Sequence, residues 1–184
     1  PGIVQDTMDE FYKHTGRRYS LFYYLGHPEA EKIAVIMGSG QGPVMEAVDT
    51  MVKNGEKVGA LIVRLYRPFS IDHFIDALPE TVKKVAVLDR TKEPGSTGEP
   101  LYLDVVSAFM ESDREMPQII GGRYGLSSKE FDPAMVKAVF DELDKPKPKN
   151  HFTIGINDDV SYKSLDVGGR LETVKTTFNC MFYG

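Results

Sequence analysis

The sequence predicts an α/β fold in which an open, doubly wound, mostly parallel sheet is flanked by helices. Two observations lead to this prediction. Continuous apolar runs occupy residues 33–37, 58–63 and 85–88, as expected for parallel strands that are buried on both faces. Segments with helical apolar periodicity separate these runs, and alternation of this kind is typical of βαβ units.

The N-terminal part of the chain predicts a short helix followed by an extended stretch. In residues 3–13, apolar side chains recur near i, i+4 and i+8, which favours an amphipathic helix. Four aromatic residues then fall within the six positions from Tyr19 to Tyr24. We expect this stretch to be extended and to pack across the unit that follows.

Start and stop signals place the other helices between the strands. Asn54 and Gly55 close the first of them, and Ser70 is the expected N-cap of the second. Asp132 and Pro133 have the residue types of an N-cap and a first helical position. The predicted helices cover residues 44–53, 71–78, 101–110 and 133–143, and two further strands cover 118–120, ending at Gly121 and Gly122, and 151–156.

The chain divides into three predicted parts. Residues 1–31 form the N-terminal helix and extended arm, residues 32–156 form the α/β domain, and residues 157–184 form a connector and the first strand of a further domain. A lone strand is not stable without its sheet, and the chain opens at Pro1 without a methionine, so we expect a piece of a longer protein. The alternation that predicts the last strand places on one face Val174, Thr176, Phe178, Cys180 and Phe182.

Composition excludes several classes of protein. The chain has 22 lysine and arginine residues against 27 aspartate and glutamate residues, and this net charge of −5 argues against nucleic-acid binding. Cys180 is the one cysteine, so no internal disulfide can form. No apolar run approaches the ~20 residues of a membrane span. We therefore expect a cytoplasmic protein with neither nucleic acid nor membrane among its partners.

The first candidate binding site is the glycine-rich loop Gly38-Ser39-Gly40-Gln41-Gly42, between a predicted strand and a helix. Such a loop can present backbone N–H groups to a phosphate. It lacks the Lys-Ser/Thr ending of a P-loop and the third glycine of the dinucleotide fingerprint. The next strand ends in Arg64, which with Arg67 could hold the 2′-phosphate of NADP. The favoured interpretation is a tight turn, and the NADP site stays open beside it.

Two further candidate surfaces follow later predicted strands. Residues 89–95 combine acidic and basic groups that could pair with one another or bind an anion. Residues 121–128 combine permissive glycines with Arg and Tyr, residue types that anchor buried interfaces. We favour an interface over an active site for both. The candidate interdomain contacts are Asp89, Arg90, Lys92, Glu93, Arg123 and Tyr124.

The remaining residues give no catalytic or metal-binding pattern. The four histidines, His14, His27, His73 and His151, are isolated in the sequence, and none has the spacing of a zinc site. The sequence has neither a G-x-S-x-G nucleophile elbow nor an assignable triad. We therefore predict neither catalytic nor metal-ligating residues.

Six longer motifs are specific enough to indicate a protein family as well as a fold class. They are MGSG (37–40), GEKVG (55–59), VRLYRPF (63–69), VLDRTKEPG (87–95), GEPLYLDV (98–105) and GGRYGLSSK (121–129). Together they closely resemble pyruvate:ferredoxin (flavodoxin) oxidoreductases over essentially the whole chain. In that family they belong to the second domain, which resembles the C-terminal domain of transketolase-type enzymes. Residues 178–184 resemble the entry to the family's third, coenzyme-A-associated domain.

The resemblance implies a parent enzyme that decarboxylates pyruvate on thiamine diphosphate with Mg²⁺. Its electrons pass through 4Fe–4S clusters to ferredoxin or flavodoxin, and the acetyl group passes to coenzyme A. The resemblance implies no cofactor in this chain and no activity of the chain alone. Its implied role is structural, through contacts with the remaining domains and support of a homodimer. The alternative is a small-molecule-binding module that holds coenzyme A or NADP phosphates at the Gly38–Gly42 loop.

Overall fold

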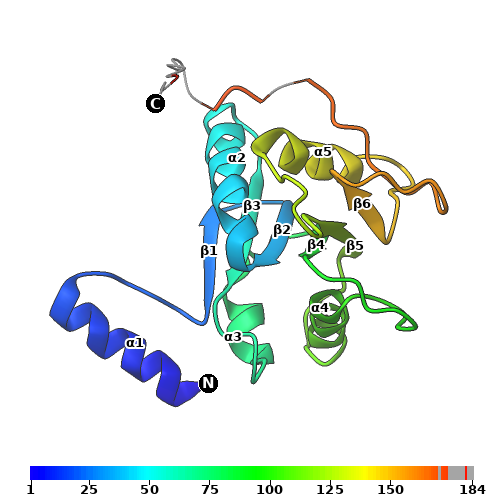
Figure 1. The fold of residues 1–184 in the computed structure, drawn as a ribbon. Helices are drawn as coiled ribbons and strands as arrows, with labels where there is room; N and C mark the ends of the chain where they lie inside the picture. The colour runs from blue at the N-terminus through cyan, green and yellow to red at the C-terminus, as the bar shows by residue number, and fades with distance from the viewer. Residues whose placement is uncertain (170, 174–180, 182–184) are drawn as a thin grey trace.

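The computed structural model describes residues 1–169, 171–173 and 181, and its centre is a six-stranded sheet (Figure 1). The strands lie in the order β1-β3-β2-β4-β5-β6, and every neighbouring pair is parallel except β1 with β3. This arrangement confirms the predicted open, mostly parallel α/β sheet. The strands are β1 (Phe22–Gly26), β2 (Lys32–Met37), β3 (Val58–Val63), β4 (Lys84–Asp89), β5 (Gln118–Tyr124) and β6 (Phe152–Ile154).

The central strands are buried because their side chains are apolar on both faces. Val35 of β2 pairs with Leu61 of β3 on one side and with Val87 of β4 on the other. Successive residues of a strand point to opposite faces of the sheet. Val35, Leu61 and Val87 therefore lie in one hydrophobic core, whereas Ala34 and Ile36 lie in the other.

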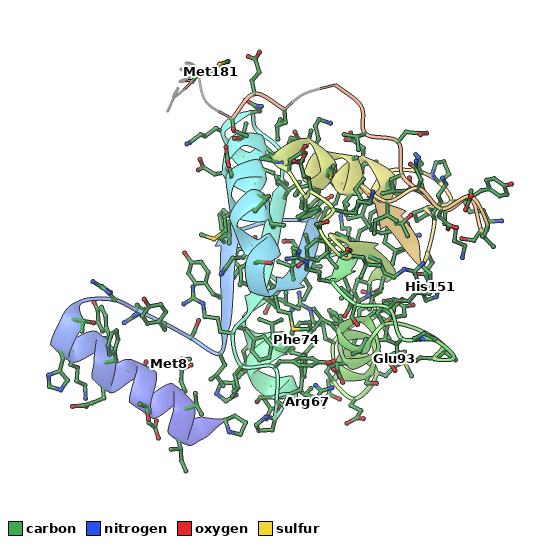
Figure 2. All side chains as sticks on the ribbon, viewed as in Figure 1. Met8, Arg67, Phe74, Glu93, His151 and Met181 are labelled. Atoms are coloured by element: carbon green, nitrogen blue, oxygen red, sulfur yellow. The ribbon has the colours of Figure 1, made fainter. Side chains whose placement is uncertain are left out.

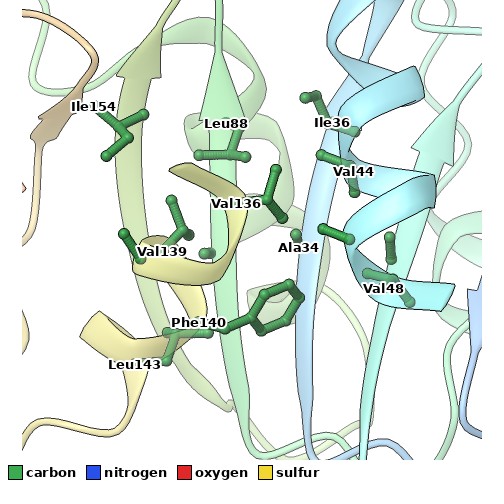
Figure 3. Packing of buried hydrophobic residues seen from close by; sticks show 14 of the residues in the cluster. Ala34, Ile36, Val44, Val48, Leu88, Val136, Val139, Phe140, Leu143 and Ile154 are labelled. Atoms are coloured by element: carbon green, nitrogen blue, oxygen red, sulfur yellow. The ribbon is translucent and has the colours of Figure 1, made fainter. Parts of the chain in front are cut away.

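Helices cover both faces of the sheet. Figure 1 shows α2 and α5 over one face and α3 and α4 over the other. Val44 of α2 and Val139 and Phe140 of α5 belong to the same hydrophobic core, the first of the two (Figure 3). The Asp132 carboxylate accepts a hydrogen bond from the Met135 backbone N–H at 2.9 Å, which confirms the predicted N-cap. The helices are α2 (Gln41–Lys53), α3 (Ile71–Asp76), α4 (Pro100–Met110) and α5 (Pro133–Leu143).

The N-terminal helix α1 (Gly2–Thr15) stands beside the sheet and confirms the helix predicted over 3–13 (Figure 1). None of its residues is buried. Met8, labelled in Figure 2, is half-buried against the second core. The Leu21 backbone N–H donates to Gln5 Oε1 at 3.2 Å, and this contact ties the helix to the start of β1.

Strand β1 lies where the sequence predicts only an extended stretch. It pairs antiparallel with β3, from Phe22 opposite Val63 to Gly26 opposite Gly59. Tyr24 of β1 covers Gly59 so closely that a Cβ on this glycine would overlap the tyrosine ring. The missing side chain on β3 thus lets an aromatic-rich segment join the sheet, and sequence periodicity along β1 alone does not reveal that partner.

The predicted end of the fifth strand at Gly121 and Gly122 is wrong, since β5 continues through both glycines to Tyr124. A Cβ on Gly121 would lie 2.8 Å from the Tyr102 ring, and a Cβ on Gly122 would overlap the Phe152 ring. These glycines therefore make room for aromatic rings packed against the strand. They do not mark a turn.

The division of the chain into three parts, with boundaries at residues 31 and 156, stays a prediction. Strand β1 lies before the first of these boundaries, yet its hydrogen-bonded partner lies after it. The strand predicted over 173–184, with Cys180, falls outside the described residues except for Thr173 and Met181. None of the described helices is long and apolar enough to cross a membrane.

Candidate functional site

The candidate residues from four strands meet at one edge of the sheet. Strands β2 to β5 are parallel, so their carboxyl ends lie on the same side. The Gly38 loop follows β2, Arg64 follows β3, Arg90 follows β4, and Tyr124 ends β5. Open α/β sheets bind ligands at this edge, so its geometry decides between a ligand site and a docking surface.

The Gly38–Gly42 loop is a turn packed beneath Tyr124. Gly38 adopts a left-handed backbone conformation (φ 72°) and opens a single 3₁₀ turn, after which α2 begins at Gln41. A Cβ on Gly40 would lie 2.5 Å from the Tyr124 hydroxyl oxygen. Packing against Tyr124 therefore explains why residue 40 is a glycine, and no bound phosphate is needed to explain it.

The two arginines proposed for a 2′-phosphate lie in different surroundings. The Arg64 guanidinium lies between two tyrosine rings, 4.9 Å from the centroid of Tyr19 and 4.8 Å from that of Tyr23. Arg67 pairs with Asp104, with 2.7 Å between Nη2 and Oδ2. Arg64 shares a shallow hollow of about 390 Å³ with Gly38, and Arg67 is not part of its lining.

Asp89 is fully buried at the end of β4. Its Oδ1 accepts the Leu101 backbone N–H at 3.0 Å and its Oδ2 accepts the Tyr102 backbone N–H at 3.1 Å. Burial raises the pKa of this carboxyl to about 6. The carboxylate holds the first turn of α4 against the sheet, and it offers no surface to another domain.

Arg90 links the glycine loop to the segment after β5. Its Nη1 donates to Ser39 Oγ at 2.6 Å, and its Nε donates to the Gly125 carbonyl oxygen at 2.8 Å. Lys92 and Glu93 are exposed beyond it. Of the residues predicted after β4, these three therefore lie where a partner could reach them.

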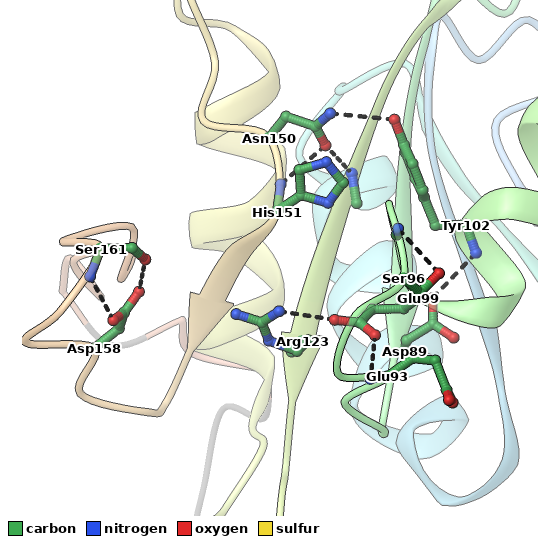
Figure 4. A network of polar contacts seen from close by, with 12 residues as sticks. Asp89, Glu93, Ser96, Glu99, Tyr102, Arg123, Asn150, His151, Asp158 and Ser161 are labelled. Atoms are coloured by element: carbon green, nitrogen blue, oxygen red, sulfur yellow. Dashed lines mark hydrogen bonds and ion pairs between the residues drawn. The ribbon is translucent and has the colours of Figure 1, made fainter.

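Arg123 and Tyr124, at the end of β5, differ in their access to a partner. Arg123 forms an ion pair with Glu99, with 2.7 Å between Nη1 and Oε1, and the two side chains are 19% and 8% exposed (Figure 4). Tyr124 is buried, and its hydroxyl donates to the Met37 carbonyl oxygen at 3.3 Å. Its ring packs on Phe131 with centroids 4.4 Å apart, so Tyr124 belongs to the core.

Comparison with known proteins adds a family to this geometry. A family model described as pyruvate:ferredoxin oxidoreductase core domain II matches residues 30–132. The chain belongs to this family. The match covers the sheet from before β2 to the end of β5, and with it the carboxyl-edge residues described above.

The chain spans less than half the length of the relatives that it matches. A pyruvate-flavodoxin oxidoreductase of a Nostoc species is 62% identical over 160 residues, which are 87% of this chain and 40% of the relative. The pyruvate:ferredoxin oxidoreductase of Moorella thermoacetica is 53% identical over 185 residues, 100% of this chain and 16% of the relative. Among solved structures, a 2-oxoglutarate:ferredoxin oxidoreductase of Magnetococcus marinus, with 2-oxoglutarate, coenzyme A and succinyl-CoA bound, is 24% identical to this chain. The match covers 68% of this chain and 20% of the chain in that structure, with a TM-score of 0.47.

A second polar network, which the sequence did not reveal, lies at the amino end of β6 beside the middle of β5 (Figure 4). Asn150 Oδ1 accepts the Gly121 backbone N–H at 2.8 Å, and its Nδ2 donates to the Tyr102 hydroxyl at 3.1 Å. His151 lies edge-on to Tyr102 with ring centroids 5.3 Å apart, and burial lowers its pKa. Asn150 closes the lysine- and proline-rich linker, where nothing in the sequence signals a partner on β5.

The contacts at the carboxyl edge of the sheet determine which ligands its charged side chains are free to bind. The buried or partly buried carboxylates Asp89, Glu99 and Asp104 each bind a backbone amide or an arginine of this chain. Within residues 1–169, 171–173 and 181, no group of three or more His, Cys, Asp or Glu side chains is placed to hold a metal ion. The arrangement organises loops and a helix start around β4 and β5.

Proposed function

We propose that this chain is a structural domain of a pyruvate:ferredoxin or pyruvate:flavodoxin oxidoreductase. In the parent reaction, pyruvate and coenzyme A give acetyl-CoA and CO₂, and the electrons pass to ferredoxin or flavodoxin. Family membership and the names of the long relatives support the parent activity. The domain contributes by contacting the remaining domains and supporting a homodimer.

The pairing of Arg67 and Arg123 with carboxylates of the same chain is the observation that carries the structural role. A phosphate site in an α/β fold needs unpaired cations or open backbone amides. Here Arg123 is paired with Glu99, and Arg67 is paired with Asp104. These two arginines are therefore not free to bind a phosphate, and their ion pairs hold neighbouring segments of the edge together, as expected of a surface that docks against another domain.

The cofactors of the parent belong to its other domains in this proposal. An iron–sulfur cluster needs several cysteine thiolates, and the chain has one cysteine, so its residues do not fit a 4Fe–4S cluster. Thiamine diphosphate is held through Mg²⁺, which oxygen ligands such as carboxylates bind. The buried carboxylates of the described edge are already engaged by α4 and by arginines.

The small-molecule-binding alternative at Gly38, Ser39 and Gly40 is not favoured. It requires Arg64 and Arg67 to converge on the loop, and only Arg64 lines the hollow beside Gly38. The remaining partners we propose are the other domains, a second copy of the parent, and ferredoxin or flavodoxin bound elsewhere. With one cysteine and no disulfide framework, we place the enzyme in the cytoplasm.

Steady-state kinetics of the complete oxidoreductase test the structural role. We expect Arg64→Ala to leave the KM values for coenzyme A and pyruvate unchanged, because the guanidinium contacts two tyrosine rings. Arg18→Ala is the matched control, since Arg18 lies over Tyr12 at 4.8 Å on the N-terminal arm. A rise in the KM for coenzyme A of about tenfold or more in Arg64→Ala alone would instead indicate a lost phosphate contact of roughly 1.5–3 kcal/mol.

A further inference from the structure

Arg90 and Lys129 lie at the carboxyl edge, and neither has a carboxylate partner among the residues that the structure describes. Arg90 and Lys129 line the same hollow, of about 210 Å³, together with Ser39, Tyr124 and Phe131. No acidic residue lines this hollow. It lies between the glycine loop before α2 and the segment that follows β5.

The basic residues of the carboxyl edge differ in their partners, and among the described residues the Arg64 guanidinium contacts only two tyrosine rings. Arg67 and Arg123 each pair with a carboxylate, whereas the Arg90 guanidinium donates only to neutral oxygens, those of Ser39 and of the backbone after β5. The Lys129 ammonium has no hydrogen-bond or ion-pair partner among the residues that the structure describes. Both stay unpaired in a chain whose net charge is −5, where carboxylates outnumber cations.

The hollow is also organised for one kind of occupant. Ser39 and the Gly125 carbonyl hold two nitrogens of Arg90, so the guanidinium is fixed before any partner arrives. The rings of Tyr124 and Phe131, with centroids 4.4 Å apart, form an apolar wall on one side of the hollow, and Arg90 and Lys129 are exposed to solvent. The side from which α2 begins adds the positive end of a helix dipole.

The size of the hollow separates the possible anions. Pockets for cofactors and drug-sized ligands measure roughly 300–1,000 Å³. About 210 Å³ does not enclose a whole nucleotide or coenzyme A, and it suffices for one carboxylate side chain. Guanidinium and ammonium groups bind carboxylates through short, charge-assisted hydrogen bonds.

We propose that the hollow between Arg90 and Lys129 receives an aspartate or glutamate side chain from another domain of the parent oxidoreductase. This inference rests on the proposed structural role of the chain, and it adds the chemistry of the partner and the residues that bind it. Arg90 both organises the loops and binds the incoming carboxylate. Lys129 contributes to binding alone.

The test replaces Lys129 rather than Arg90, because Arg90 also holds two loops of the chain. Lys129→Glu is made in the complete oxidoreductase and in the 184-residue chain, and thermal unfolding of both is measured. We expect the variant to lower the unfolding temperature of the complete enzyme by several degrees and to leave that of the chain unchanged. Lys147→Glu, an equal charge change at an exposed linker position, is expected to alter neither.

The other outcomes overturn the inference in recognisable ways. If Lys129→Glu changes neither protein, no carboxylate docks there. If it destabilises the 184-residue chain as well, Lys129 acts within the domain. If millimolar phosphate stabilises the wild-type chain and not the variant, the hollow holds a free anion. Stabilisation of the chain by coenzyme A would contradict the structural role itself, and that readout is separate from the Lys129 comparison.

Discussion

Replacing Gly122 by alanine is expected to lower the free energy of unfolding by about 2–3 kcal/mol, as overpacking of a filled core does. Gly122 of β5 lies directly opposite Phe152 of β6, and the Phe152 ring occupies the space that a Cβ would need. Phe152 is fully buried in the core beneath α5, so its ring has no free space to move into. Urea unfolding followed by circular dichroism measures the change.

Gly42 provides the matched control for this substitution. A Cβ at Gly42 would meet no atom within 4 Å, and its backbone φ is not left-handed. Because glycine is a poor helix former, Gly42→Ala in the first turn of α2 should be neutral or stabilising by up to about 1 kcal/mol. Equal effects of the two substitutions would show that β6 does not depend on the glycine of β5.

Arg123→Met is expected to destabilise the chain by about 2–3 kcal/mol, because it leaves a nearly buried carboxylate without its partner. Glu99 is 8% exposed and lies 2.7 Å from Arg123, and its second oxygen accepts the Glu93 backbone N–H at 2.8 Å. Loss of the guanidinium should therefore loosen the loop between β4 and α4 as well. Chemical unfolding gives the size of the effect, and hydrogen exchange of residues 90–99 locates it.

Two comparisons distinguish the cost of breaking a buried ion pair from the cost of removing an arginine side chain. Arg67→Met removes an arginine whose side chain is 55% exposed, beside an Asp104 that is 26% exposed, and should cost less than about 1 kcal/mol. Adding Glu99→Leu to Arg123→Met should recover much of the lost stability, since the unpaired charge is then gone. A double variant that is no more stable than Arg123→Met would contradict the assignment.

Most of the sheet could be predicted from the sequence, because its strands are continuous apolar runs. The runs at 33–37, 58–63 and 85–88 correspond to β2, β3 and β4. The extent of β5 could not be predicted in this way. Two consecutive glycines usually indicate the end of a strand. Here they continue the strand because the rings of Tyr102 and Phe152, from other elements, occupy the space that their side chains would need.

The sequence predicted where the candidate residues lie in the fold better than it predicted what each of them does. The topology puts the chosen residues at one edge, since parallel strands share their carboxyl side. Asp89 and Tyr124 look like surface contacts in the sequence, yet both are buried. The sequence does not distinguish a polar residue that follows a strand and faces solvent from one that follows a strand and caps the next helix. Glu99, at the N-cap of α4, was missed because its partner Arg123 lies on β5, 24 residues away.

A thermal unfolding scan of the 184-residue chain with ligands tests the structural role most directly. The ligands are coenzyme A, NADP(H) and Mg–thiamine diphosphate, each at millimolar concentration. A ligand present at 100 times its Kd stabilises a protein by about 2.7 kcal/mol, so binding would be plain in the scan. We expect no shift with any of the three. A shift with coenzyme A or NADP(H) that Arg64→Ala abolishes would contradict the structural role and assign a phosphate site to the Gly38–Gly42 loop.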